Sequence, residues 1–213
     1  MASFDTLRTP DYSPLLVHFT KDRPLAMANL LTEDHPLFAH KQTSAKEKLT
    51  NILVCRQVYG SPMPLLPHNP TGVSFTECIW RALMPHTDRY SRYGIVFSKR
   101  LIFQRGGGPA LYVRGDCLKA LGNTIPPNLE RLMSPFDPEG ILLAGVPFDY
   151  LHEREWRLPG DLQFEYADVE CVIVDSLKDA LDIIQHIGEQ NLPLRKVIPM
   201  ETWETTLKAW GDI

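Results

Sequence analysis

The sequence predicts an α+β fold in which helices flank a mixed β-sheet. Strand-like segments fill the middle of the chain at 72–76, 93–97 and 109–113, and helical patterns lie on both sides of them. The segment 169–199 places an apolar strand, an amphipathic helix and a second strand in succession, which is the pattern of a β-α-β crossover. Together these observations favour a mixed sheet over a regular doubly wound one.

The first predicted elements are a short strand and a capped helix. Residues 14–20 form an apolar run that predicts a buried strand. Ser44 is expected to begin a helix, because Glu47 three residues later completes a capping box. We expect this helix to end at Gly60, and four prolines within 61–70 predict a stiff loop after it.

The later elements follow from caps and helix breakers. Ser98 is predicted to cap a helical turn over 99–103. A longer helical pattern over 116–133 should be interrupted at Pro126, because proline cannot continue a helix. The remaining predicted elements are a strand at 169–174, a helix capped by Asp175 or Ser176 and ending near Gly188, a strand at 196–199, and a terminal helix from Thr202 to about Trp210.

Composition predicts a cytoplasmic protein with one domain over residues 1–213. The net charge of −4 gives no global attraction to nucleic acid or membranes. No apolar run approaches the roughly 20 residues that span a bilayer, and the N-terminal residues lack the charged and apolar parts of a signal peptide. The four cysteines match no zinc spacing, so we expect no metal site. Their apolar surroundings predict buried free thiols in a reducing compartment, with a disulfide pair as the alternative.

The most informative stretch runs from His152 to Arg157 and holds two carboxylates two residues apart. If Glu153 and Glu155 stand at the entrance to a strand, both side chains point to one side of it. Like charges that share a space suit acid/base work or the stabilisation of a cation. The structural alternative is an ion-pair ladder at the surface, in which Arg154 and Arg157 neutralise the two acids.

Three further short stretches each have both a structural and a functional interpretation. A histidine between apolar residues is commonly a satisfied core residue, alternating hydroxyl residues occur on any half-exposed strand, and Tyr-Gly is a common strand start. The stretches are His18-Phe19-Thr20, Ser74-Phe75-Thr76-Glu77 and Tyr93-Gly94-Ile95-Val96-Phe97-Ser98.

Taken in order with Glu153-Arg154-Glu155-Trp156-Arg157, these stretches resemble the ADP-ribosyltransferase superfamily. The overall likeness is to the AbiGi-type abortive phage-resistance proteins, over most of the chain, and more distantly to the DNA- and RNA-modifying toxins of the DarT kind. The resemblance implies a split mixed β-sheet and NAD-dependent transfer of ADP-ribose to a macromolecule, such as DNA or RNA. It also implies a role in phage defence or a toxin–antitoxin system, with NAD as co-substrate and an antitoxin protein as a partner.

The resemblance implies a role for each candidate residue. Cleavage of the nicotinamide–ribose bond passes through an oxocarbenium-like cation, which a fixed carboxylate stabilises. Glu155 is expected in that role, with Glu153 as the base that orients or deprotonates the acceptor. The expected NAD-binding residues are His18 and Thr20 for the adenosine-side ribose, and Ser74, Thr76 and either Tyr90 or Tyr93 beside the nicotinamide.

The chain departs from the family pattern in two ways. A first-strand histidine and a Glu-x-Glu pair usually belong to different branches of the superfamily. Neither branch by itself therefore supplies the roles of both His18 and the Glu153/Glu155 pair. Glu77, at the end of the Ser-Phe-Thr stretch, is an alternative catalytic carboxylate. Arg23, Arg56 and Arg81 remain equal candidates for the NAD pyrophosphate.

A basic stretch suggests where an acceptor would bind. Cations that track phosphates and rings that stack on bases are typical of nucleic-acid grooves, although a solvated face with inward aromatics gives the same pattern. The expected substrate-binding cations are Arg89, Arg92, Lys99, Arg100 and Arg154, with Arg105 in the same stretch. Gly106-Gly107-Gly108 after it suits either a phosphate-binding nest or, more commonly, a hairpin connection.

The competing function is a transferase-like fold without catalysis that serves as an antitoxin or partner-binding protein. Glu155 and His18 lining one cleft would favour the enzyme. Glu155 held in a salt bridge with Arg154 or Arg157 on a convex surface would favour the binding protein.

Overall fold

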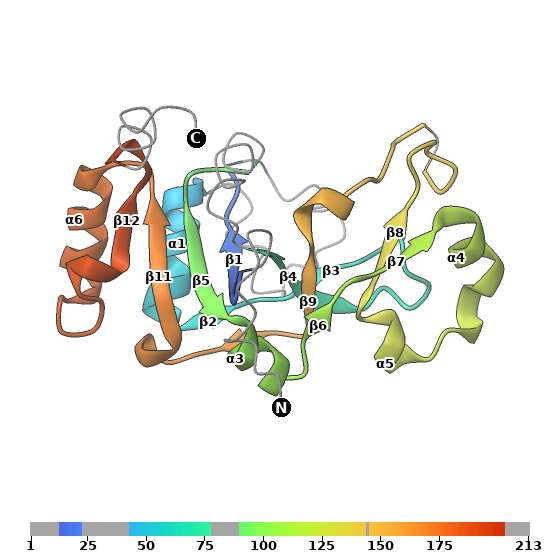
Figure 1. Cartoon of the computed structure of the whole chain (residues 1–213), viewed down its shortest axis with the longest axis horizontal. Coiled ribbons are helices and arrows are strands. Elements are labelled where there is room, and N and C mark those ends of the chain that lie inside the picture. Colours follow the sequence, from blue (N-terminus) through green and yellow to red (C-terminus); the bar gives the residue numbers. More distant parts are fainter. Residues whose placement is uncertain (1–12, 23–42, 78–89, 144, 203–213) are drawn as a thin grey trace.

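The computed structural model describes residues 13–22, 43–77, 90–143 and 145–202. Within these residues the protein has a mixed α and β architecture, in which helices flank a mostly antiparallel sheet (Figure 1). This confirms the predicted α+β class at the level of architecture. No described helix combines the length and the apolar character needed to cross a membrane.

The main sheet has the strand order β12-β11-β5-β1-β4-β9-β6, with β3 paired beside β4. All of its pairings are antiparallel except the parallel pair β11 and β12, so the predicted β-α-β unit is present. Its strands are β1 (Leu15–Phe19), β3 (Ser61–Pro62), β4 (Thr71–Glu77), β5 (Gly94–Ser98), β6 (Gly108–Pro109), β9 (Trp156–Pro159), β11 (Val169–Val174) and β12 (Val197–Pro199).

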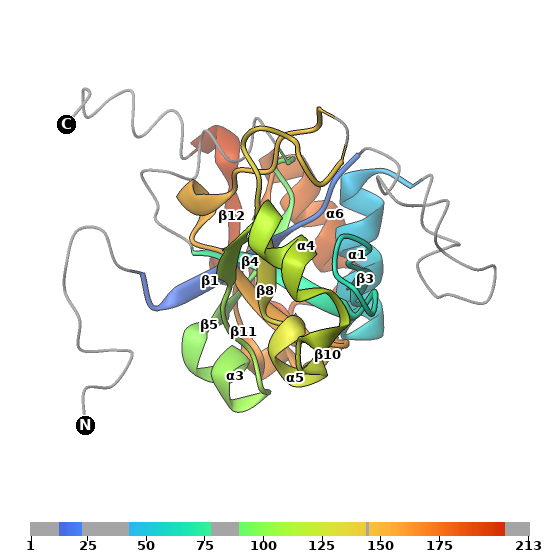
Figure 2. The ribbon, with the colours of Figure 1, turned by 90° about the vertical axis from the view of Figure 1, so that its right-hand side faces the viewer.

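Two small sheets complete the described strands. One pairs β2 (Gln57–Val58) with β10 (Leu162–Gln163), and the other pairs β7 (Leu111–Arg114) with β8 (Met133–Phe136) in parallel. The β7–β8 sheet lies with the helices α4 (Gly115–Leu121) and α5 (Pro127–Glu130) at the end of the molecule opposite α6 (Figures 1 and 2).

The main sheet has an apolar core on each face. On one face, Leu53 of α1 (Ala45–Cys55) and Ile183 of α6 (Leu177–Ile187) are buried with residues of the strands, including Phe75 and Phe97. On the other face, a second cluster includes Val17 and Phe19 of β1, Val96, Ile173 and Met200. Side chains of β1 therefore alternate between the two cores, as expected of a strand buried on both sides.

The capping predictions hold, but one helix ends earlier than expected. Ser44 and Glu47 form the complete capping box of α1. The helix ends at Cys55, not at Gly60, because Arg56 adopts a left-handed conformation and the chain then enters β2, which pairs with β10. Tertiary strand pairing thus overrides the local helical pattern.

The other element predictions are mostly confirmed. Ser98 caps α3 (Lys99–Gln104) and Ser176 caps α6. The helical pattern after residue 115 is interrupted as expected, with α5 restarting at Pro127. Residues 200–202 are helical, so the predicted terminal helix begins before Thr202, and the rest of its predicted range lies outside the described residues.

Candidate functional site at the divergence of β1 and β4

The candidate site lies where β1 and β4 cease to pair. These strands pair only at Leu16 with Glu77 and at Val17 with Thr76. Beyond this point β1 continues alongside β5, and β4 continues alongside β9. The sheet therefore divides beyond the pair of Val17 and Thr76, so that His18 and Ser74 lie on the diverging parts of β1 and β4.

Ser74 forms hydrogen bonds with two of the predicted site residues, His18 and Glu155. The His18 Nδ1 atom lies 2.9 Å from the Ser74 carbonyl oxygen. A carbonyl oxygen only accepts hydrogen bonds, so Nδ1 carries the proton and Nε2 is an acceptor in the neutral ring. Burial lowers the pKa of His18, against the effect of the Ser74 bond, so the neutral form is favoured. The Ser74 hydroxyl in turn donates to Glu155 Oε1 at 2.8 Å.

Glu155 is buried in an ion pair. Its carboxylate is reached by Arg157, whose Nε donates to Oε1 at 2.8 Å, and the two residues are only 7% and 8% exposed. The same guanidinium donates to the Met133 carbonyl oxygen and, at 3.1 Å, to the Ser134 hydroxyl. The Glu155 carboxylate is thus fixed by a serine hydroxyl and a cation, away from bulk water.

Glu153 and Glu155 are not on one strand, which corrects the sequence prediction. Glu153 belongs to the 3₁₀ turn Leu151–Glu153, Arg154 follows with a left-handed φ of 46°, and β9 begins only at Trp156. Glu153 accepts from the Tyr90 hydroxyl with both oxygens, at 2.5 and 2.6 Å. The relative positions of the Glu153 and Glu155 side chains therefore follow from the turn and not from the two-residue period of a strand.

The two acids nevertheless act electrostatically on one group. Burial, followed by the nearby Glu155 and Glu153 charges, raises the pKa of Tyr112 to about 12. The Tyr112 hydroxyl donates to the Tyr150 carbonyl oxygen at 2.8 Å. Both carboxylates are therefore close enough to this phenol to disfavour its ionisation.

His18 and Glu155 approach Ser74 from different directions. The His18 ring packs edge-on against Phe75, with ring centroids 6.0 Å apart, and Phe75 pairs with Trp156 on the core face of α1 and α6. Neighbouring strand residues point to opposite faces, so the Ser74 side chain, which Glu155 contacts, leaves β4 on the other side. The His18 imidazole thus contacts the carbonyl oxygen of Ser74, and the Glu155 carboxylate contacts the Ser74 hydroxyl.

A small cavity of about 220 Å³ adjoins the Glu155 ion pair. Ser74, Ser134 and Arg157 line it together with apolar side chains such as Met63 and Phe148, whereas His18 is not among its lining residues. Drug-sized ligands usually occupy about 300–1,000 Å³. The cavity therefore suits one end of a dinucleotide and not the whole molecule.

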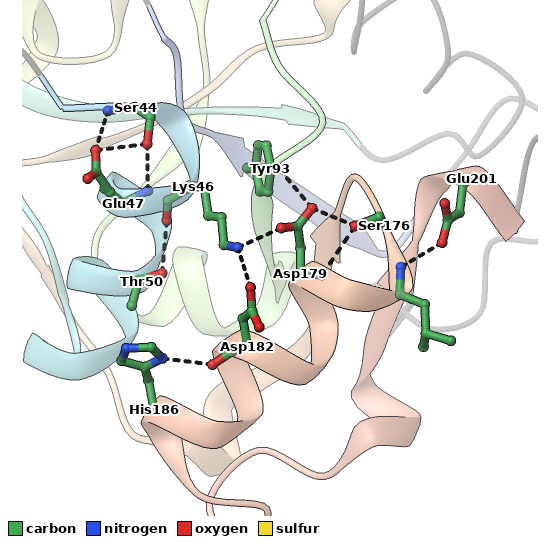
Figure 3. Close-up of polar contacts among 11 residues, drawn as sticks. Ser44, Lys46, Glu47, Thr50, Tyr93, Ser176, Asp179, Asp182, His186 and Glu201 are labelled. Carbon is green, nitrogen blue, oxygen red and sulfur yellow. Dashed lines mark hydrogen bonds and ion pairs between the residues drawn. The ribbon is translucent and has the colours of Figure 1, made fainter.

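The remaining predicted NAD-binding residues lie in two places, near the Glu-x-Glu stretch or beside helices α1 and α6. Thr76 is buried, and the Thr20 hydroxyl donates to the Ala45 carbonyl oxygen at 2.8 Å. Tyr93 points toward α6, where its hydroxyl donates to Asp179 at 3.0 Å (Figure 3). Of the two candidate tyrosines, it is Tyr90 that is bonded to an acid of the Glu-x-Glu stretch.

The predicted substrate-binding cations do not form one groove among the described residues. Lys99 is 3% exposed and pairs with Glu77 at 3.0 Å, which contradicts its expected place on a binding surface. Burial also lowers the pKa of Lys99, against the effect of Glu77. Arg92 pairs with Asp175, Arg154 is partly exposed near Glu77, Arg100 is exposed, and Arg89 lies outside the described residues.

Three alternatives remain from the sequence, namely Glu77 as the catalytic carboxylate, one of three arginines for the NAD pyrophosphate, and a glycine nest for phosphate. Glu77 accepts from the Ser13 main-chain N–H at 2.8 Å as well as pairing with Lys99, so it joins segments of the fold. Arg56 pairs with Glu165, while Arg23 and Arg81 lie outside the described residues. In the glycine run, the Gly106 and Gly107 N–H groups bond to α3 carbonyl oxygens, which agrees with a connection rather than an anion nest.

Sequence reasoning missed two residues that hold the site. Arg157 was expected only as a neutralising surface charge, and nothing in the pattern around Tyr112 singled it out. Arg157 of β9 falls two residues after Glu155, which immediately precedes the strand, and the i, i+2 spacing of extended chain places both side chains on one side. Tyr112 comes from another sheet and has no sequence signal of this kind.

Comparison of the chain with protein-family models, with curated proteins and with solved structures gives no match.

Proposed function

We propose that the protein transfers ADP-ribose from NAD to a macromolecule, with DNA and RNA as the acceptors to test first. The observation that carries this proposal is the hydrogen bond from Ser74 to Glu155, where β1 and β4 diverge. It joins the Ser-Phe-Thr strand to the Glu-x-Glu stretch, the two segments on which the resemblance to ADP-ribosyltransferases depends. The divided sheet also agrees with the split core of that fold.

The chemistry fits a buried, fixed carboxylate. Breaking the bond between ribose C1′ and the nicotinamide nitrogen sends the bonding electrons to nicotinamide and leaves a cation on the ribose. Glu155 would stabilise this cation without reorientation, because Ser74 and Arg157 already hold it. Glu153 would take the proton from the attacking acceptor group. The Nε2 atom of His18, which is an acceptor in the neutral ring, suits a ribose hydroxyl.

Glu155→Gln tests the proposal with the smallest change. The glutamine keeps an oxygen that accepts from Ser74 but loses the charge. We expect purified wild-type protein to transfer label from adenine-labelled NAD to DNA, RNA or a lysate component, and Glu155→Gln to reduce the rate by about 10²-fold or more. Glu189→Gln, at an exposed position, is the matched control and should keep the wild-type rate. Absence of label on every acceptor, or equal rates for the two variants, contradicts the proposal.

The Arg157–Glu155 ion pair favours the second candidate, a partner-binding protein on a transferase-like fold. The pair occupies the carboxylate that catalysis requires, and the adjoining cavity does not include His18. The two functions differ in one measurement. The enzyme binds NAD in a calorimetric titration, and Glu155→Gln changes the turnover of bound NAD. The binding protein gives no heat of NAD binding in either form.

A further inference from the structure

The 3₁₀ turn Leu151–Glu153 contains Glu153, and Arg154 joins this turn to Glu155. Arg154 has a left-handed φ of 46°, a conformation that is unfavourable for a residue with a side chain. Such a turn keeps one geometry only when surrounding contacts hold it. In addition to the side-chain contacts already described, the main chain of Glu155 is held by the segment Ala110–Tyr112.

Both main-chain groups of Glu155 are bonded to that segment. The Ala110 N–H donates to the Glu155 carbonyl oxygen at 2.8 Å, and the Glu155 N–H points to the Tyr112 hydroxyl at a longer 3.4 Å. The same hydroxyl donates to the Tyr150 carbonyl oxygen at 2.8 Å. One phenol therefore joins the start of the turn at Tyr150 to its end at Glu155.

We propose that Tyr112 is a positioning residue, which fixes Glu153 and Glu155 by joining both ends of the turn that carries them. For catalysis this inference rests on the proposed function. A tyrosine with its usual pKa of about 10 is neutral at physiological pH, and burial and the two acids raise the pKa of Tyr112 further. The neutral hydroxyl can therefore donate its proton to the Tyr150 carbonyl oxygen and accept from the Glu155 N–H at the same time. Through Tyr112 the small β7–β8 sheet sets the position of the turn that contains Glu153 and of Glu155, which immediately precedes β9 of the main sheet.

Tyr112→Phe removes only the oxygen that makes both contacts, and Tyr166→Phe is its matched control. The Tyr166 hydroxyl also donates to a carbonyl oxygen, that of Leu53 in α1, at 3.0 Å, but Tyr166 is a partly buried residue that packs against the core of the main sheet. We expect Tyr112→Phe to lower kcat for NAD at least 10-fold and up to about 10²-fold, with KM for NAD within about twofold, because small displacements of catalytic groups act on the reaction step. Tyr166→Phe should leave both constants within about twofold.

A merely structural role predicts a different result. It gives equal losses of activity in the two variants, or an unchanged kcat in Tyr112→Phe, and either result overturns the proposal. A rise in KM at constant kcat also overturns it, because that would place Tyr112 in NAD binding rather than in positioning.

Amide hydrogen exchange of the ligand-free protein separates this inference from the proposed function. Tyr112→Phe should speed exchange at the Glu155 amide at least 10-fold and leave β11 amides at the wild-type rate. Unchanged exchange at Glu155 overturns the inference whether or not the protein turns over NAD. A wild-type protein without NAD turnover ends the proposed function, and faster exchange at Glu155 then still supports Tyr112 as the residue that fixes the two acids.

Discussion

Ser74 brings the candidate site together through two different atoms. Beyond Val17 and Thr76 the strands β1 and β4 no longer pair, and the His18 imidazole donates to the Ser74 carbonyl oxygen. The Ser74 hydroxyl is then available to Glu155. A serine fits this position because its short side chain reaches the carboxylate without filling the adjoining cavity. Ser74 can make both contacts because β1 and β4 diverge next to it.

The lowered pKa of His18 predicts a pH dependence of stability. Desolvation of the partly buried ring lowers the pKa of His18 in the folded protein below the usual value of about 6.5. The unfolded chain therefore takes up the proton first as the pH falls, and the contribution of neutral His18 to folding is lost from about pH 6.5 downward. We expect His18→Asn, which keeps a donor for Ser74 but does not titrate, to weaken the fall in the free energy of unfolding between pH 7.5 and pH 5.5.

Urea denaturation at the two pH values measures this difference. His186→Asn is the control, because the His186 Nδ1 atom also bonds to a carbonyl oxygen, that of Asp182, but at an exposed position. A pH dependence of His18→Asn equal to that of the wild type would show that His18 titrates alike in the folded and unfolded states.

Among the elements, α1 and α6 are joined by a polar contact as well as by apolar packing. Lys46 of α1 reaches two carboxylates of α6, Asp179 at 2.6 Å and Asp182 at 2.7 Å (Figure 3). The hydrogen bonds to these acids raise the pKa of Lys46. Asp179 also accepts from Tyr93 and Ser176, so one carboxylate links α1, the start of β5 and the cap of α6.

Removal of this lysine should loosen the two helices. Because Lys46 is partly exposed, we expect Lys46→Met to lower the free energy of unfolding by about 1 kcal/mol. Lys178→Met, on the exposed side of α6, should change it by less than about 0.5 kcal/mol. Urea denaturation in low salt measures both variants, and the Lys46 effect should shrink in 1 M NaCl because salt screens exposed charges. Equal stabilities of the two variants would show that the contact contributes nothing.

At the scale of the molecule, the apolar clusters on the main sheet are larger than the cluster at the β7–β8 end. We therefore expect these two parts to differ in stability. The clusters on the main sheet include strands β1, β5 and β11 together with α1 and α6. The end with β7, β8, α4 and α5 has a separate cluster with four buried members, namely Leu66, Leu118, Ile125 and Met133. A small apolar cluster gives less free energy of burial, so this end should open before the main sheet.

Native-state hydrogen exchange in increasing urea tests that expectation. Amides of β7 and β8 should exchange through a partial opening with a lower free energy than amides of β5 and β11, which should require global unfolding. One common opening free energy for all four strands would show instead that the molecule unfolds as a single cooperative unit.

Local signals predicted many of the elements, because caps and apolar runs act over a few residues. The Ser44–Glu47 box, the Ser98 cap and the interruption before Pro127 all appear as expected. The end of α1 was misplaced, because the pairing of β2 with β10 is a contact between residues over 100 positions apart. The side-chain environment of Lys99 was missed for the same reason, since Glu77 comes from another strand.

The sequence by itself determined the α+β class, the crossover at 169–199 and the residue types at the candidate site, since these follow from composition and short-range periodicity. Only the tertiary structure decided that Ser74 contacts both His18 and Glu155. It also decided that Glu153 lies in a turn and that Tyr112 joins the ends of that turn. The physical reason is that these contacts join segments 38 to 81 residues apart, and strand pairing across the sheet, not local preference, sets which segments meet.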